Sequence, residues 1–196
     1  MALGFAQSNN DGGEFLPTFR FNAVSGDAVI VSSEKSGDGW EKKEVDVKFP
    51  CKLIFDFENI MVGWLHFAAT GPSFSLVKIG EQLPVKPSAD HKQGFKIKLY
   101  SKEYGVCEFA NSSKTIATVI DALHDQYLAG VKANAGRVPV VEIKGTKKVQ
   151  VTTKEGTKNY KQPDWSIVSW VARPEALIVK AAPSKVEDQP IDDDDF

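Results

Sequence analysis

The chain has 196 residues, of which 42% are hydrophobic and 26% charged, and its formal net charge is -2. This composition is typical of one globular domain with flexible ends, and no apolar run approaches the roughly 18 residues of a membrane span. The first ten residues lack a basic stretch followed by a long apolar run, so no signal peptide is expected. Cys51 and Cys107 lie in strand-like sequence and are typical of reduced core residues, which favours a cytoplasmic location.

Charge is unevenly distributed along the chain. Residues 187–196 carry six acids and no base, and the remaining residues hold 24 bases against 20 acids. The bases concentrate in residues 86–161, which carry 14 bases and seven acids. A basic body with an acidic tail indicates a protein that handles nucleic acid, although lysines that only solvate the surface would give the same small excess.

The first half of the chain reads as an arm followed by strands. Residues 1–14 are rich in Gly, Asn and Asp and are expected to form a flexible arm. Apolar alternation or short apolar runs predict strands at 18–24, 28–33, 45–49, 52–57, 60–69, 94–101 and 105–110. Turns are expected at 26–27 and 36–39, and a proline-containing loop at 83–94.

One helix is predicted over about 112–129. Its apolar residues recur at helical spacing, Ser112 or Ser113 can cap its first turn, and Gly130 can end it. Strands follow at 137–144, 147–153 and 164–172, with turns at 144–147 and 154–159. Residues 15–175 therefore form the predicted domain, and residues 176–196 a disordered linker and acidic tail.

Several strands, one helix and more strands predict a mainly β fold. A helix between the third and fourth strands of a small barrel is the plan of the OB-fold, a five-stranded barrel that binds single strands and oligosaccharides. Extra strands would be added to that barrel. A β-sandwich with one helix is the alternative.

The residues give little support for catalysis. The three histidines are widely separated, the cysteines are 56 positions apart, and no phosphate-binding glycine loop is present. A disordered acidic run would offer no fixed geometry for a cation. We therefore expect a protein that is not an enzyme and has no cofactor or metal site.

Nucleic-acid binding is better supported, because single-strand binders combine basic grooves with aromatic faces on which bases stack. In 94–101, Phe95, Ile97 and Leu99 fall on one face, which leaves the opposite face for binding. The basic residues comprise 21 lysines and three arginines, and lysine suits phosphates of any sequence. Core packing is the competing explanation for the tryptophans. The candidate DNA-binding residues are Trp64, His66, Lys96, Lys98, Tyr100, Lys144, Lys147, Lys148, Lys154, Lys158, Tyr160, Lys161 and Trp165.

The segment "DQPIDDDDF" resembles the acidic C-terminus of bacterial and phage single-stranded DNA-binding proteins, in which aspartates precede a terminal phenylalanine. The stretch "GWLHFAATGPSFSLV…PSADHKQGFKIKLYS" is similar to the core of a phage protein of this class. Asp195 stands where the bacterial proteins usually have proline, which is closer to the phage type.

The resemblance implies an OB-fold body that coats single-stranded DNA during replication, recombination or repair in the cytoplasm of a host cell. It also implies a tail that recruits a polymerase, helicase or primase through Asp192, Asp193, Asp194, Asp195 and Phe196, and that competes with DNA for the basic groove. Two alternatives stay open. One is an acidic-tailed interaction or structural protein with a β-sandwich body, and the other is an accessory subunit or inhibitor of a replication enzyme. A homodimer and a monomer are both compatible with the sequence.

Overall fold

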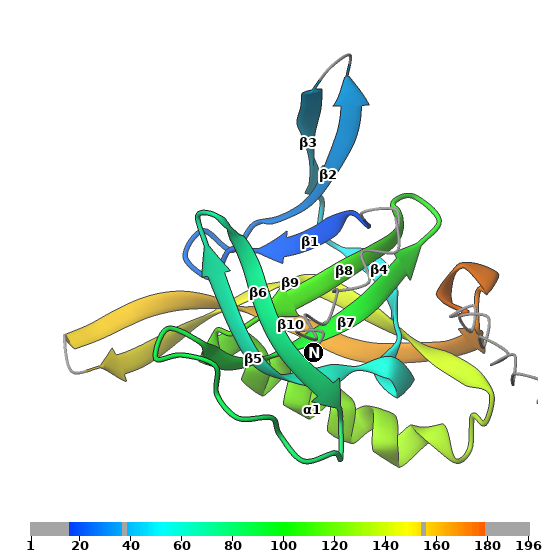
Figure 1. The fold of residues 1–196 in the computed structure, drawn as a ribbon. Helices are drawn as coiled ribbons and strands as arrows, with labels where there is room; N and C mark the ends of the chain where they lie inside the picture. Colours follow the sequence, from blue (N-terminus) through cyan, green and yellow to red (C-terminus); the bar gives the residue numbers. More distant parts are fainter. Residues whose placement is uncertain (1–15, 37–38, 154–155, 179–196) are drawn as a thin grey trace, which may run out of the picture.

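A computed structural model describes residues 16–36, 39–153 and 156–178 of the chain. The predicted N-terminal arm, Lys154 and the tail from residue 179 onward lie outside these ranges. The described part is mainly β, with one α-helix, as predicted (Figure 1). The folded body extends past the predicted boundary at 175, because a 3-10 turn, η2 (Glu175–Leu177), places Leu177 in the interior with 1% of its surface exposed.

The strands and the helix follow in chain order. They are β1 (Thr18–Phe21), β2 (Ala28–Ser36), β3 (Gly39–Val47), β4 (Cys51–Phe55), β5 (Met61–Ala68), β6 (Gly71–Lys78), β7 (Lys92–Ser101), β8 (Gly105–Asn111), α1 (Lys114–Val131), β9 (Arg137–Thr153) and β10 (Gly156–Ala172). A 3-10 turn, η1 (Phe57–Asn59), connects β4 to β5.

All ten described strands belong to one mixed sheet with the order β10-β9-β4-β7-β8-β1-β2-β3, and the β5–β6 hairpin branches from β7. β1 pairs with β8 in parallel, whereas the other pairs are antiparallel. The sheet is open, with β10 and β3 at its ends, so the closed barrel expected from the sequence is not formed by the described strands. One backbone hydrogen bond, from Lys161 N to Ala23 O at 2.7 Å, links β10 to the turn after β1.

The core lies on the inner face of the curled sheet. Phe95, Ile97 and Leu99 are at most 4% exposed, which confirms the predicted inner face of β7. Trp165 from β10 contacts four phenylalanine rings at centroid distances of 5.6–6.3 Å, namely Phe19, Phe21, Phe55 and Phe109. Aromatic side chains bury large apolar areas, so this cluster joins β1, β4, β8 and β10 across the interior.

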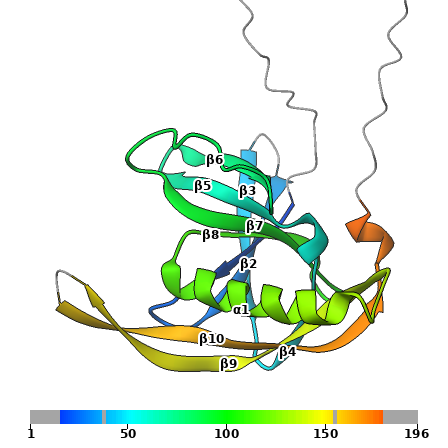
Figure 2. The ribbon, with the colours of Figure 1, turned by 90° about the horizontal axis from the view of Figure 1, so that it is seen from below.

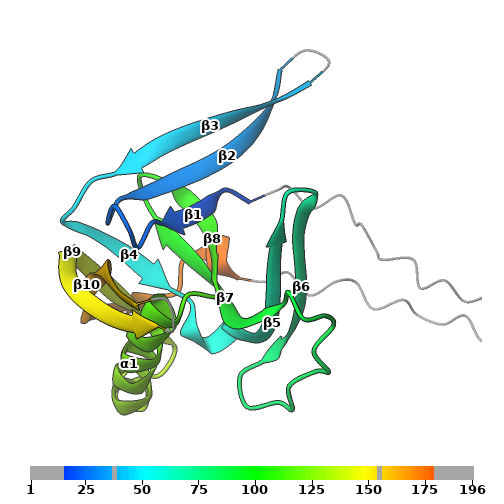
Figure 3. The same cartoon turned by 90° about the vertical axis from the view of Figure 1, so that its left-hand side faces the viewer.

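Hairpins project from this core. In Figure 1 the β2–β3 hairpin rises above the body and the β9–β10 hairpin extends to its left. Figure 2 shows α1 lying along β10. Gln126 on α1 accepts a hydrogen bond from Ile167 N on β10 at 3.3 Å, which fixes this packing. Figure 3 shows the β5–β6 hairpin on the side of the molecule away from α1.

The helix differs from its predicted bounds by two residues at each end. Ser113 is the N-cap, but its side chain makes no capping hydrogen bond, and Asn111 Oδ1 instead accepts from Ser113 N at 2.7 Å. Gly130 does not end the helix. A Cβ at Gly130 would lie 2.6 Å from Trp170 Cζ2, so the glycine permits close packing of helix and strand rather than a left-handed stop.

The strand predictions missed two features of the hairpins. The turn expected at 144–147 is absent, because β9 continues through it, and the register shift opposite Asp164 and Trp165 is accommodated next to Gly145 at φ 153°. β6 and most of β3 were not predicted. The first eight residues of β3 are exposed, so they lack the alternation that a half-buried strand shows.

Candidate nucleic-acid interface

The outer face of β7 carries the three residues that the sequence placed there. Lys96, Lys98 and Tyr100 are each partly exposed and alternate with the buried inner residues. Lys96 Nζ lies 2.8 Å from Glu108 Oε1 on β8, an ion pair whose side chains are about 28–29% exposed. Tyr100 is directly opposite Ile54 of β4, which shares the outer face. β7 spans ten residues, so this face offers a track about 30 Å long.

At one end of the track is a hollow of about 930 Å³, here named the hairpin groove, between β1, β8 and the β5–β6 hairpin. Phe67 lies on its wall with 53% of its surface exposed, and its ring meets Phe74 edge to face at 5.4 Å. Arg20 and Lys92 line the same groove, together with Glu108. An open aromatic face beside two cations is the combination that a stacked base and its phosphate require.

At the other end is a second hollow of about 890 Å³, here named the turn groove, beside the β7–β8 turn. Tyr100 and Tyr104 line it, as do Asp46 and Glu103. Its cations come from three segments and are Lys48, Lys52 and Lys102. Burial, followed by the hydrogen bond and charge of Glu103, raises the pKa of Tyr104, so this phenol stays neutral. The track therefore has aromatic and basic residues at both ends.

Trp64 and His66 occupy the opposite side of the β5–β6 hairpin from Phe67. Trp64 Nε1 donates to Pro84 O at 2.8 Å, and the Lys86 ammonium lies 5.5 Å from the centre of its ring. The His66 ring is 5.3 Å from that of His91, which is 6% exposed and contacts Ser88 and Ser73. Both candidate residues thus pack under the 79–91 loop, and Phe67 takes the open position instead.

Trp165 is not a surface residue. It is 7% exposed at the centre of the phenylalanine cluster, and its Nε1 has no hydrogen-bond partner among the described residues. Placing it among the DNA contacts was therefore wrong. The strand that carries it alternates inward at this point, opposite Ile143 of β9, and four phenylalanine rings surround the indole.

The remaining candidate residues lie on the β9–β10 hairpin and are divided between its two faces. Lys144, Lys147, Lys148 and Lys158 are exposed, whereas Tyr160 and Lys161 are partly buried. Lys147 Nζ contacts Asp164 Oδ1 at 2.8 Å, and Lys161 Nζ donates to Ser25 O at 2.5 Å. Lys161 therefore anchors β10 to the turn after β1. Lys154 and Asp192 to Phe196 lie outside the described residues.

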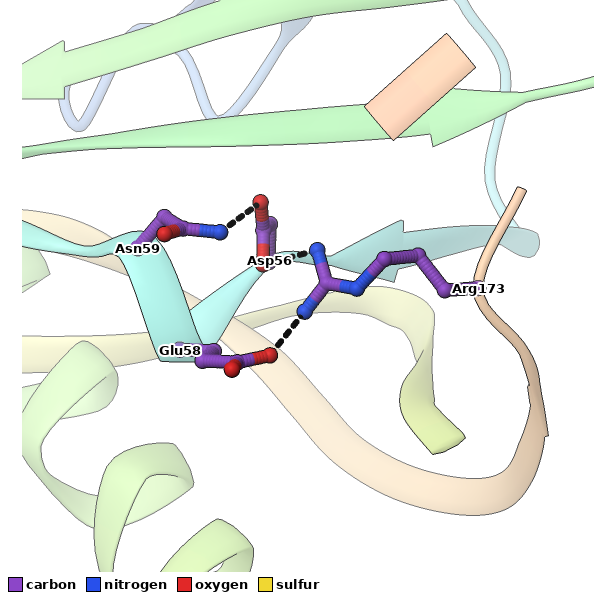
Figure 4. A network of polar contacts seen from close by, with 4 residues as sticks. All are labelled: Asp56, Glu58, Asn59 and Arg173. Carbon is purple, nitrogen blue, oxygen red and sulfur yellow. Dashed lines mark hydrogen bonds and ion pairs between the residues drawn. The ribbon is translucent and has the colours of Figure 1, made fainter. Parts of the chain in front are cut away.

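A buried ion pair fixes the base of the β5–β6 hairpin (Figure 4). Asp56 is 0% exposed, and its carboxylate accepts from Arg173 Nη1 at 2.8 Å and from Asn59 Nδ2 at 2.9 Å. Arg173 also contacts the Glu58 carboxylate. Burial opposes the charge of Arg173, but hydrogen bonding and attraction from Asp56 and Glu58 outweigh it and raise its pKa. This clamp joins the end of β10 to the connection that leads into the hairpin.

The described residues offer no metal cluster of three or more His, Cys, Asp or Glu side chains. Burial raises the pKa of Cys51 to about 11 and that of Cys107 to about 12, with Glu103 and Glu108 adding to the respective shifts. Neither thiol forms an appreciable thiolate near neutral pH, and the thiolate is the reactive species. Nowhere in the described ranges does a helix combine the length and apolarity that crossing a bilayer requires.

Sequence reasoning missed the groove residues Phe67, Phe74, Arg20 and Lys92. Phe67 alternates with Trp64 and His66 along β5, so choosing those two residues as DNA contacts left Phe67 on the face assumed not to bind. The segment that carries Phe74 was not recognised as a strand. Recognising this segment as a strand paired with β5 would have predicted the groove. In that pairing Leu65 lies opposite Phe74 and Phe67 lies opposite Pro72, so Phe67 and Phe74 fall on the same face of the hairpin.

Comparisons of the chain with protein-family models, curated proteins and solved structures give no match.

Proposed function

We propose that the chain is a sequence-independent single-stranded DNA-binding protein of the phage type, with an OB-fold-like body and an acidic tail. The observation that carries this proposal is the outer track of β7. Along it, Lys96, Lys98 and Tyr100 run between two grooves that each combine exposed or partly exposed aromatic rings with cations. Such an arrangement suits bases that stack and phosphates that need positive charge.

The strand connections support an OB-like body. β4, β7 and β8 correspond to the first three barrel strands, α1 follows, and β9 and β10 are the fourth and fifth. β4 pairs with both β7 and β9, β7 pairs with β8, and β9 pairs with β10. β1 pairs with β8 on one side and with β2 on the other, and one backbone hydrogen bond joins the turn after β1 to β10, on the side where a barrel would otherwise close. OB-folds are partly open barrels, so an inserted strand is compatible with this plan.

The position of the track agrees with this correspondence. OB-folds bind oligonucleotides on strands 2 and 3 and on the loops between strands 1 and 2 and strands 4 and 5. Here strands 2 and 3 are β7 and β8, and the first loop is replaced by the β5–β6 hairpin and the 79–91 loop. The hairpin groove lies where these parts meet. The β9–β10 hairpin, with its exposed lysines, supplies the second loop.

The charges favour contacts that do not depend on sequence. The hairpin groove and the track carry Arg20, Lys92, Lys96 and Lys98 beside the carboxylate of Glu108, and the turn groove carries Lys48, Lys52 and Lys102 beside Asp46 and Glu103. Lysine acts as a point charge toward phosphate, and a phenyl face accepts any base. The same chemistry would act in replication, recombination and repair, wherever single strands are exposed.

The tail is proposed to recruit a replication protein. Phe196 would fill a small apolar pocket on a polymerase, helicase or primase, and Asp192 to Asp195 would steer the encounter with its basic rim. The tail would also compete with DNA for the grooves of its own body. Both effects weaken with salt, because exposed charges are screened within about 8–10 Å at physiological ionic strength.

The test is a titration with fluorescent oligo-dT and with duplex DNA at low and high salt. We expect the single strand to bind more tightly than the duplex. The logarithm of its association constant should fall by about 0.7 per phosphate neutralised for each tenfold rise in salt concentration. Equal, near-millimolar binding of both DNAs at low salt would contradict the proposal. It would favour a protein-interaction role, for which the exposed apolar residues Ile79, Leu83 and Val85 offer a surface.

A further inference from the structure

The β2–β3 hairpin, here named the arm, packs against the core at its base, through Ala28, Ile30 and Val47, and its outer part projects from the body (Figures 1 and 3). Its two strands pair from Ala28 and Val47 at the base to Ser36 and Gly39 near the tip. Trp40, close to the tip, is 65% exposed. An exposed aromatic ring on a projecting hairpin presents a face on which a nucleic-acid base can stack.

Strand pairing shows which side of the sheet carries Trp40. Directly paired residues share a face, and residues two apart on a strand return to it. Lys98 pairs with Glu108, Glu108 with Thr18, and Thr18 with Val31. Two and four residues beyond Val31 are Ser33 and Lys35, which pair with Lys42 and Trp40. Trp40, Lys35 and Lys42 therefore lie on the same face of the sheet as the track.

Near its tip, the arm separates charge between its two faces. Trp40 shares its face with Lys35 and Lys42, and the acids on that face, Glu44 and Asp46, lie nearer the base. The opposite face carries Glu34 and Glu41, which are paired across the strands, and Lys43, which lies 3.9 Å from Glu34. An aromatic ring between two cations thus faces the same way as the proposed DNA track. The carboxylates near the tip face away from it.

We propose, on the basis of the proposed function, that the arm is a second contact for the same single strand. Trp40 provides a stacking platform for a base, and Lys35 and Lys42 contact the flanking phosphates. Lys35 lies four residues beyond the point where β1 pairs with β2, so the arm extends the binding face by about 13 Å. Short oligonucleotides would fill the track and grooves, and only longer ones would reach the arm.

The experiment compares Trp40→Ala with wild type on oligo-dT of two lengths. One OB-fold covers roughly 4–16 nucleotides, so about six nucleotides lies near the lower end of this range and about 20 exceeds its upper end. We expect Trp40→Ala to weaken binding of the longer oligonucleotide roughly 5- to 150-fold, the loss of one stacked base, and to leave the shorter one unchanged. Trp40→Phe, which keeps an aromatic face, should retain most of the affinity.

Adjacent lysines supply a matched control. Lys42→Ala should weaken binding of the longer oligonucleotide, whereas Lys43→Ala, on the other face of the same strand, should not. The proposal is overturned if Trp40→Ala leaves the longer oligonucleotide unaffected, as a protein-docking arm would. An equal loss at both lengths overturns it as well. If wild type binds neither oligonucleotide, the proposed function itself fails, which is a different outcome from failure of the arm alone.

Discussion

Both sides of the β5–β6 hairpin carry aromatic residues, but one side is open and the other is covered by a loop. On one side, Phe67 and Phe74 open onto the hairpin groove beside Arg20 and Lys92. On the other, Trp64 is capped by the 79–91 loop through its hydrogen bond to Pro84. Strand alternation separates these two sides but does not say which one is open. The loop decides that, because it folds over one side and leaves the other exposed.

The largest expected effect is a loss of stability when the clamp at the base of the β5–β6 hairpin is broken, because the clamp holds both sides of the hairpin in place. Within the described ranges, Arg173→Met leaves the buried Asp56 carboxylate with Asn59 as its remaining side-chain partner. Removing one partner of a buried ion pair costs about 3 kcal/mol or more of unfolding free energy. Urea denaturation measures this loss. Arg137→Met is the control, since Arg137 is exposed, and it should change stability by about 0.5 kcal/mol or less. Equal effects of the two substitutions would show that the clamp does not stabilise the fold.

The comparison itself is tested by exchanging one aromatic residue on each side for alanine. Phe67→Ala should reduce oligo-dT affinity by about 1–3 kcal/mol, the value of a stacked base, with little loss of stability. Trp64→Ala should do the reverse, because it removes the capping contacts of the 79–91 loop. Fluorescence titration and thermal unfolding of both variants separate these outcomes. A larger DNA defect in Trp64→Ala than in Phe67→Ala would reverse the assignment of the open side.

The burial of the Cys107 thiol should make the stability of the fold depend on pH. The pKa of Cys107 is raised to about 12 in the fold from an ordinary value near 9, so the folded state holds its proton more tightly. This contribution to stability is fully present below about pH 9 and is lost as pH rises toward 12. We expect wild type to lose about 1 kcal/mol per pH unit more than Cys107→Ala in that window, measured by urea unfolding. Parallel pH profiles would contradict this expectation.

The tail should have a smaller effect on DNA binding. Removing residues 187–196 takes away six acidic side chains and should raise oligo-dT affinity at low salt, by less than about tenfold, with the gain shrinking as salt screens the charges. Phe196→Ala keeps the six acidic side chains and should leave DNA affinity near wild type. It should weaken binding to a replication partner, because an apolar anchor carries much of an interface. Unchanged partner affinity, measured by calorimetry, would make the tail an electrostatic device only.

The smallest expected effect is a change in the salt dependence of DNA binding. It distinguishes a lysine on the track from a lysine that holds the fold together. Lys98→Ala should lower the salt slope of DNA binding by about 0.7, the value of one phosphate contact. Lys161→Ala should leave the slope unchanged, because its ammonium already contacts Ser25 O inside the fold. Salt titrations of the two variants decide whether the track or the base of the β9–β10 hairpin meets phosphate.

Much of the body could be predicted from periodicity. The alternation in β7 identified both its faces, and the helix was located within two residues at each end. The exposed strand β3 and the partly exposed strand β6 gave no such signal, because neither is buried on one regular face. Trp165 and Gly130 were misassigned for a different reason. Their roles depend on partners distant in sequence, the phenylalanine cluster for Trp165 and Trp170 for Gly130.

The most direct test of the central claim is to map amide chemical shifts by NMR as oligo-dT is added. If the outer face of β7 binds the strand, the largest changes should fall on Lys96 to Tyr100, on the Phe67 end of the hairpin and on Arg20. The amides of α1 and of the 79–91 loop around Pro84 should move least. Changes concentrated on α1 or on that loop, with the β7 track unaffected, would contradict the account.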